Sequence, residues 1–138
     1  MFKNNISLDS FQEMSKGTLS DHLGIEFVEI GDDFIIAKMP VVKNNQQPFG
    51  ILHGGASVVL AETLGSIASV LCLDDPQKQR AVGLEINANH LRSVSSGWVF
   101  GRVSPIHVGR RTHIWDIKIT NEEGKLVCVS RLTVAIVE

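Results

Sequence analysis

The chain has 138 residues, a length that suits one domain, and hydrophobic residues make up 43% of it. That content is enough for a globular core and excludes a disordered chain. The net charge of −2 argues against a basic surface for nucleic acid, so we expect a single domain over residues 1–138 and no nucleic-acid partner.

The first ten residues and the two cysteines bear on the compartment. MFKNNISLDS contains no apolar run of signal-peptide length. Cys72 and Cys128 cannot form a disulfide framework or a CxxC site, so we expect two small thiols that are buried or half-buried. The expected location is therefore the cytoplasm.

A short helix is predicted near the N-terminus. Ser7 is a typical N-cap, and Gly17 is a typical stop signal. Between them, Leu8, Phe11 and Met14 would form one apolar stripe.

Six later runs have the composition of strands and are bounded by turn signals such as Gly31-Asp32-Asp33 and NEEGK at 121–125. The predicted strands are 25–30, 34–39, 81–94, 97–106, 110–120 and 125–137. In the fifth run, alternate residues put one set of side chains on a single face: His113, Trp115, Ile117 and Ile119. Residues 42–50 and 73–80 are predicted loops.

A long apolar segment separates the second strand from the third. Residues 54–72 predict one helix that is apolar on almost every side, and Ile51–Cys72 approaches the length of a membrane span. We reject a span because the segment contains His53, Glu62 and several hydroxyls, and a charge at the bilayer centre is costly. Such a helix can instead be the buried centre of a soluble domain, so no membrane partner is expected.

The order of elements predicts the fold. It is a short helix, two strands, a long helix and four strands, and strands joined by tight turns should be antiparallel. Only the sheet is large enough to cover the long helix. The predicted class is therefore α+β, with the antiparallel sheet wrapped around one long central helix as in the hot-dog fold.

Glu62 is the only carboxylate in the long helix, and its residue type allows two interpretations. It could pair with an arginine at the rim of the core, as buried charges usually do. It could instead be a catalytic base or nucleophile, because poorly hydrated sites favour reactive carboxylates. Ser66 follows one turn later on the same face, within reach of Glu62.

Three stretches resemble one family. QPFGILHGGASVVLAETLGS, from Gln47 to Ser66, is similar to the signature of hot-dog acyl-CoA thioesterases of the PaaI-like group. VGLEINANHLRS (82–93) and PIHVGRR (105–111) strengthen a resemblance that covers nearly the whole chain. Within this family the chain resembles thioesterases that act on 1,4-dihydroxy-2-naphthoyl-CoA in menaquinone biosynthesis, and those that proofread enterobactin synthesis.

The resemblance implies roles for the central motif. Glu62 would attack the thioester carbonyl or activate water, and Ser66 would lie near Glu62 or the attacking water. The N–H of Gly54 would polarise the carbonyl, which suits the unsatisfied N–H groups at a helix N-terminus. Gly54 and the adjacent glycine could equally be no more than a tight joint between loop and helix.

Two residues that precede the helix complete the implied catalytic set. Gln47 matches a family glutamine that positions or polarises the same carbonyl, and His53 would have a supporting role. Without the resemblance Gln47 would be taken for a solvated loop residue, because the neighbouring Gln46 does not differ from it locally.

The spacing within the helix predicts a dimer. Glu62 follows Gly54 by eight positions, or roughly 12 Å along a helix axis. One thioester carbon cannot touch both groups on one helix, whereas an antiparallel second helix would bring its Glu62 beside the first Gly54. We therefore expect a twofold homodimer with active sites shared between subunits. The family commonly pairs such dimers into tetramers, so a dimer of dimers is expected.

Coenzyme A requires cations for its phosphates, and arginine suits them because of its forked, permanent charge. The resemblance implies that two segments contact the nucleotide, and that Gly83 lies near the pantetheine or acyl arm. The segments comprise His90, Leu91, Arg92 and Ser93, then His107, Val108, Gly109, Arg110, Arg111 and Thr112. For any one arginine, a solvated strand edge is the competing interpretation.

Several site classes are excluded by the absence of their motifs. There is no GxGxxG or GxxxxGK[ST] loop, no GxSxG elbow, no Asp five residues before a His as in hot-dog hydratases, and no metal spacing among the five histidines. We expect no metal and no separate cofactor, since coenzyme A is part of the substrate. The predicted activity is hydrolysis of an aromatic acyl-CoA. The alternatives are proofreading of a misacylated aryl carrier protein and a non-catalytic acyl-CoA-binding module.

Overall fold

The computed structural model describes all 138 residues. Its helical elements are α1 (Leu8–Met14), α2 (Leu19–His22), the 3₁₀ turn η1 (Lys43–Asn45) and α3 (Gly54–Leu71). Its strands are β1 (Glu26–Ile30), β2 (Ile35–Pro40), β3 (Arg80–His90), β4 (Trp98–Val108), β5 (Thr112–Thr120) and β6 (Leu126–Val137).

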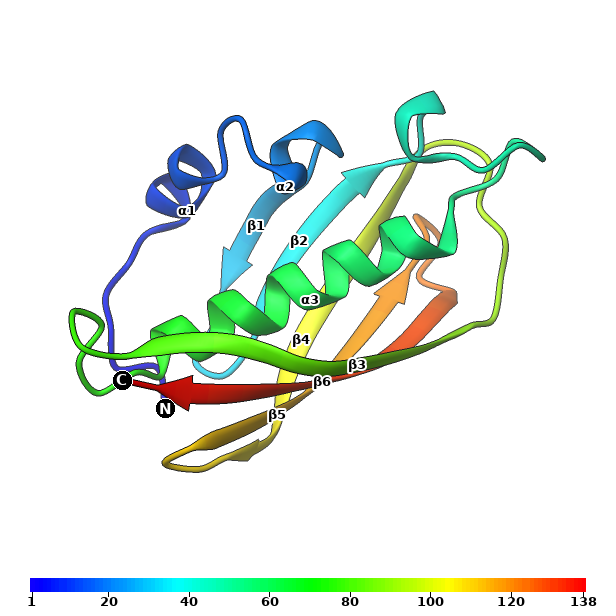
Figure 1. Ribbon diagram of the computed structural model, residues 1–138. Helices are drawn as coiled ribbons and strands as arrows, with labels where there is room; N and C mark the ends of the chain where they lie inside the picture. The colour runs from blue at the N-terminus through cyan, green and yellow to red at the C-terminus, as the bar shows by residue number, and fades with distance from the viewer.

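The six strands form one antiparallel sheet in the order β1-β2-β4-β5-β6-β3. The sheet curves around α3, which crosses its inner face, while α1 and α2 lie beside β1 (Figure 1). Helix α3 contacts every strand from β2 to β6. This arrangement confirms the predicted α+β hot-dog fold.

Helix α3 approaches the sheet closely through small residues. Ala61, Gly65 and Ala68 are fully or almost fully buried, and a Cβ on Gly65 would lie 2.5 Å from Cδ2 of Leu132 on β6. A larger side chain at Gly65 would therefore push the helix off the sheet. The helix is long and apolar enough to cross a membrane by length and composition, but half of it is buried against the strands.

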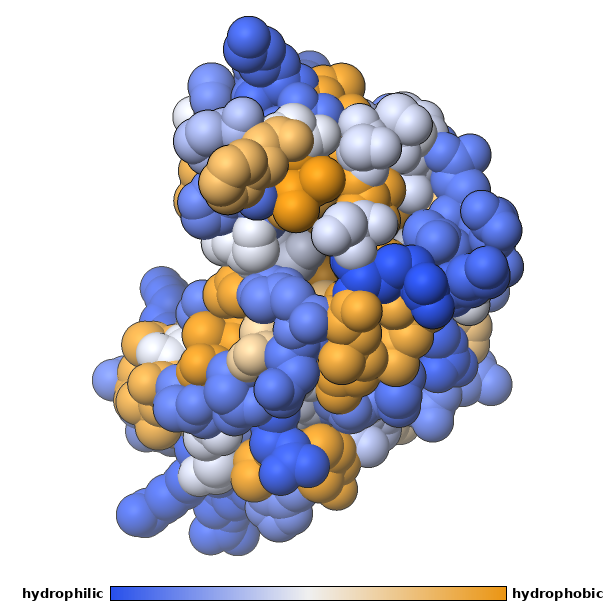
Figure 2. Space-filling model, turned by 90° about the vertical axis from the view of Figure 1, so that its right-hand side faces the viewer, coloured by the Kyte–Doolittle hydropathy of each residue, from blue (hydrophilic) through white to orange (hydrophobic).

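One face of α3 is left uncovered by the sheet. Its half-buried residues recur every three or four positions: Val59, Glu62, Thr63, Ser66, Ile67 and Val70. In Figure 1 this helix lies in front of the sheet, between α1–α2 and β3. Figure 2 looks at the molecule from the right of that view, and apolar side chains flank the hollow at its left edge. Glu62 therefore lies on the face of α3 that the sheet leaves uncovered, and it is half-buried rather than in the core.

Strand β3 is an edge of the sheet, because only β6 pairs with it. Its register shifts between Gly83 and Glu85, so that Leu84 has no partner on β6. Val82 and Leu84 are 46% and 65% exposed. A long edge strand with exposed apolar side chains can pair with a second chain.

The structure departs from the sequence prediction in three places. The helix α2 and the turn η1 were not predicted. Strand β3 ends at His90 rather than at residue 94, because the carbonyl of Val94 accepts the N–H of Leu52 in the loop before α3. Met14, predicted on an apolar stripe, is 64% exposed, since only Phe11 of that stripe reaches the core.

Candidate functional site

The N-terminus of α3 has one free N–H group. His53 is the N-cap: its Nδ1 accepts the N–H of Gly55 at 2.8 Å, and its carbonyl accepts the N–H groups of Ala56 and Ser57. The N–H of Gly54 has no acceptor. Because the helix dipole adds partial positive charge there, Gly54 offers a donor suited to an oxyanion.

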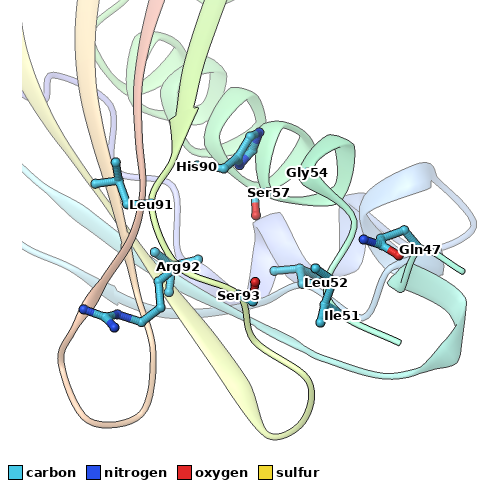
Figure 3. A pocket seen from close by; sticks show the side chains of 10 residues that line it. Gln47, Ile51, Leu52, Gly54, Ser57, His90, Leu91, Arg92 and Ser93 are labelled. Atoms are coloured by element: carbon cyan, nitrogen blue, oxygen red, sulfur yellow. The ribbon is translucent and has the colours of Figure 1, made fainter. Parts of the chain in front are cut away.

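A cavity of about 340 Å³ opens at this helix N-terminus (Figure 3). Gln47, Gly54, Ser57, His90, Arg92 and Ser93 are among the residues that line it. The ring of His90 lies over Gly54, where an added Cβ would come within 2.8 Å of His90 Nε2. A side chain at Gly54 would therefore collide with the His90 ring.

Gln47 is held with its amide donor available. Its Oε1 accepts the N–H of Phe49, and no partner is recorded for its Nε2. Gln46, by contrast, donates from Nε2 to the carbonyl of Ser95 at 3.1 Å and does not line the cavity. The structure thus distinguishes two glutamines that the sequence did not: only Gln47 joins Gly54 in presenting a free donor.

Glu62 lines a different cavity, of about 370 Å³, between α3 and the α1–α2 segment. Ser66 lines the same cavity, as do the apolar side chains of Phe11, Ile67 and Val70. Glu62 is half-buried and forms neither an ion pair nor a hydrogen bond, so the structure does not pair it with an arginine. No hydrogen bond joins Glu62 to Ser66.

Gly83 on β3 lies directly against the Glu62 carboxylate. A Cβ at this position would overlap Oε2 of Glu62. Gly83 therefore leaves room for the carboxylate at the uncovered edge of the sheet. The sequence placed Gly83 near the acyl or pantetheine arm, and in the structure it lies beside the proposed catalytic group.

One chain does not bring the two halves of the predicted catalytic set together. Gln47 and Gly54 line the first cavity, Glu62 and Ser66 line the second, and the two cavities share no residue. The eight positions from Gly54 to Glu62 span roughly 12 Å of helix. Within one chain the predicted catalytic residues are therefore divided between two separate cavities.

The two predicted nucleotide segments are also separate within one chain. His90–Ser93 borders the cavity at the start of α3, whereas Gly109 and Arg110 line a third cavity with Cys72, at the end of α3. Eighteen helical residues, or roughly 27 Å, lie between these ends. All six ion pairs of the chain use lysine, so Arg92 and Arg110 are exposed with no carboxylate partner.

A buried polar network fastens the turn between β4 and β5. Ser69 Oγ accepts the Trp115 Nε1–H at 2.7 Å and lies 2.9 Å from His113 Nδ1. Burial lowers the pKa of His113, against a hydrogen bond with the backbone of Gly109 that raises it. The network ties the end of α3 to the turn that carries Arg110.

The two cysteines are buried, as predicted, and they do not form a disulfide. Burial raises the pKa of the Cys72 thiol and also that of Cys128. A raised pKa keeps both sulfurs protonated, and protonated thiols are poor nucleophiles. We therefore leave both thiols out of the site.

Residues 49–128 match the family described as Thioesterase superfamily. This range includes the free N–H of Gly54, the unpaired Glu62 and the strands from β3 to β5. The chain belongs to the thioesterase superfamily. It is therefore an enzyme of the class that hydrolyses thioesters.

Two curated relatives extend this likeness over almost the full length. The thioesterase is 51% identical over 136 residues to the 1,4-dihydroxy-2-naphthoyl-CoA hydrolase of Escherichia coli (strain K12), with 99% of this chain and 98% of that protein covered. It is 48% identical over 136 residues to the proofreading thioesterase EntH of Cronobacter turicensis, with 99% of this chain and 98% of EntH covered.

Solved structures agree with the fold. A crystal structure of a thioesterase from Haemophilus influenzae superposes with a TM-score of 0.95 at 48% identity, covering 99% of this chain and 94% of that one. The family, the fold and the reaction class that the sequence predicted are therefore confirmed.

Sequence reasoning missed part of the lining of both cavities of this thioesterase. Ser57 lines the first cavity, and Ser15, Thr18 and Ser20 line the second. Ser57 follows Gly54 by less than one helical turn and could have been found from that spacing. The other three lie some forty residues before Glu62, and no periodicity in the sequence links them to it.

Proposed function

We propose that this thioesterase hydrolyses an aromatic acyl-CoA such as 1,4-dihydroxy-2-naphthoyl-CoA, in menaquinone biosynthesis. The observation that carries the proposal is Glu62, a half-buried carboxylate with no partner, in a cavity that is lined by apolar side chains and by hydroxyl groups. A binding module would not need such a group, because an unpaired acid costs stability and adds nothing to the binding of an apolar acyl chain. The 51% identity to the Escherichia coli hydrolase supports this substrate.

The proposed catalytic roles go to groups that have no hydrogen-bond or ion-pair partner within the chain. Glu62 attacks the thioester carbonyl carbon, with coenzyme A leaving as a thiolate and water cleaving the resulting anhydride, or it takes a proton from the attacking water. The N–H of Gly54 and the amide Nε2 of Gln47 donate to the carbonyl oxygen as it becomes negative. His53 supports this geometry by capping the helix, and Ser66 lies near Glu62.

The separated half-sites call for a second copy of the chain. Pairing of β3 with its twofold mate would cover the exposed Val82 and Leu84 and join the two sheets. The uncovered faces of the two α3 helices would then meet antiparallel, with the partner subunit's Glu62 beside Gly54. A homodimer with two shared sites is therefore part of the proposal, and such dimers would pair into a tetramer.

The same twofold arrangement would also form the binding site for the nucleotide part of coenzyme A. It would bring one chain's His90–Ser93 towards the partner subunit's β4–β5 turn, which residues 107–112 span. Arginines without carboxylate partners from both segments would then hold the phosphates of coenzyme A. We propose a single domain that acts in the cytoplasm, with no cofactor apart from the coenzyme A of the substrate.

A second candidate function has nearly equal support. The proofreading thioesterase EntH is 48% identical to this chain, against 51% for the naphthoyl-CoA hydrolase. In that role the enzyme would clear misacylated aryl groups from a carrier protein. The same catalytic groups serve both functions, so only the carrier of the acyl group differs.

Release of free thiol from a panel of thioesters tests the proposal. The panel comprises 1,4-dihydroxy-2-naphthoyl-CoA, a medium-chain acyl-CoA and an aryl-loaded carrier protein, compared by kcat/KM. We expect the aryl-CoA to be the best substrate. A higher kcat/KM for the carrier protein would favour proofreading, and saturable binding of acyl-CoA without thiol release would contradict thioesterase function.

A further inference from the structure

The cavity that holds Glu62 has a wall that the catalytic roles do not use. That wall comes from the C-terminal end of α1 and the turn into α2, and it includes Ser15 and Thr18. On the opposite side, α3 contributes Ile67 and Val70 beside Glu62. The volume of this open cavity, about 370 Å³, falls in the range of small-molecule pockets.

The hydrogen atoms of the two hydroxyls are already committed. Ser15 Oγ donates to the carbonyl of Phe11 at 2.8 Å, and Thr18 Oγ1 donates to the carbonyl of Ser15. A hydroxyl has one hydrogen and two lone pairs, so each group can offer the cavity only an acceptor. A ligand that hydrogen-bonds to Ser15 or Thr18 must therefore bring a donor.

The turn that carries these hydroxyls is held in place. The N–H of Thr18 donates to the carbonyl of Ser15, and the N–H of Gly17 donates to the Asp21 carboxylate at 2.9 Å. Gly17 has a φ of 77°, a backbone conformation that glycine adopts without strain. Fixed acceptors discriminate between ligands better than mobile ones, because little ordering entropy is lost on binding.

Ser15 and Thr18, together with the apolar lining of the cavity, favour one class of acyl group. The apolar side chains favour an aromatic ring, and the fixed acceptors favour a ring that carries a hydroxyl donor. The Glu62 carboxylate disfavours a ring that carries a negative substituent, because like charges repel at short range.

We infer that Ser15 and Thr18 determine specificity by accepting a hydrogen bond from a ring hydroxyl of the acyl group. This inference rests on the proposed function, since it assumes that Glu62 acts on a thioester whose acyl part occupies the cavity. It goes further by assigning substrate selection to the α1–α2 turn.

The test compares matched thioesters with and without the hydroxyl. The substrates are benzoyl-CoA, 3-hydroxybenzoyl-CoA and 4-hydroxybenzoyl-CoA, and the preference is kcat/KM for the better hydroxybenzoyl substrate divided by kcat/KM for benzoyl-CoA. The variants are Ser15→Ala, Thr18→Val and the double variant. Thr18 makes no capping hydrogen bond to α2, so its loss does not remove a cap. Ser10→Ala is the control, an exposed α1 hydroxyl outside the cavity.

We expect the wild type and Ser10→Ala to prefer the hydroxylated substrate. In the double variant this ratio should fall by a factor of about three to ten, which is the usual effect of removing one neutral hydrogen bond. A wild type without the preference, or a double variant of unchanged melting temperature that keeps it within two-fold, would overturn the inference. If the double variant unfolds, the two single variants are used instead: a folded single variant should lose part of the preference, and two folded single variants that both keep it within two-fold would overturn the inference. If the wild type hydrolyses neither these three thioesters nor 1,4-dihydroxy-2-naphthoyl-CoA, the proposed function itself fails, and the inference with it. If it hydrolyses only the naphthoyl thioester, the inference alone fails.

Discussion

Two variants that are inactive alone should restore activity together if the site is shared between subunits. Glu62→Gln removes the carboxylate, and Gln47→Ala removes one donor to the carbonyl oxygen. Each change should lower kcat by at least about 10²-fold. The two groups line separate cavities, and Glu62 lies roughly 12 Å along α3 from Gly54, the other proposed donor. A reacting carbon must lie within about 3.5 Å of its nucleophile, so the proposed site takes these groups from two different chains.

The size of the restored activity follows from counting sites. In a mixed dimer, one shared site carries both defects and the other carries neither. Random co-assembly makes about half of the dimers mixed, so about a quarter of all sites are intact and about a quarter of wild-type activity should return. The assay is thiol release by co-expressed variants, with native mass spectrometry to establish mixing. Separately purified variants combined in the cuvette are the control. Demonstrably mixed material no more active than its parents would refute the shared site.

Three further outcomes are expected. Gly83→Ala should displace the Glu62 carboxylate and lower kcat by about 10- to 10²-fold with little change in melting temperature; unchanged kcat would show that this contact does not position Glu62. Arg92→Ala or Arg110→Ala should raise KM for an acyl-CoA more than for the matching acyl-pantetheine, and equal increases would mean that these arginines do not contact the nucleotide. Because the pKa of His113 is lowered in the folded state, the wild type should lose stability as the pH falls below the ordinary value of 6.5, where the unfolded chain takes up the proton. His113→Asn should show a shallower loss across this pH range, and parallel melting curves would contradict a titrating His113.

The fold was largely predictable because its elements carry strong local signals. An apolar segment of helical length and six strand-like runs leave few architectures. The helix α2 and the turn η1 escaped prediction because each is about one turn long, which is too short for a periodicity to develop. The end of β3 was misplaced because residues 91–94 retain strand-like composition, whereas Leu91 makes the last backbone hydrogen bond to β6, at Val127, and Val94 bonds to Leu52.

For the candidate site, the sequence indicated the separation of Gly54 and Glu62 but not the side chains that group around each of them. The spacing of Gly54 and Glu62 was enough to predict two half-sites. Gln46 differs from Gln47 because its amide donates to the carbonyl of Ser95. This hydrogen bond joins residues that are far apart in the sequence. The contribution of α1 to the Glu62 cavity likewise arises only when the chain folds.

The kcat of Glu62→Gln on an aromatic acyl-CoA tests the central claim most directly. The substitution preserves size and removes the charge of a side chain that has no partner in the fold, so the melting temperature should change little. If the carboxylate performs the chemistry, kcat should fall by at least about 10²-fold while KM changes far less. A Glu62→Gln enzyme that keeps more than half of the wild-type kcat would contradict the assignment of Glu62 as nucleophile or base.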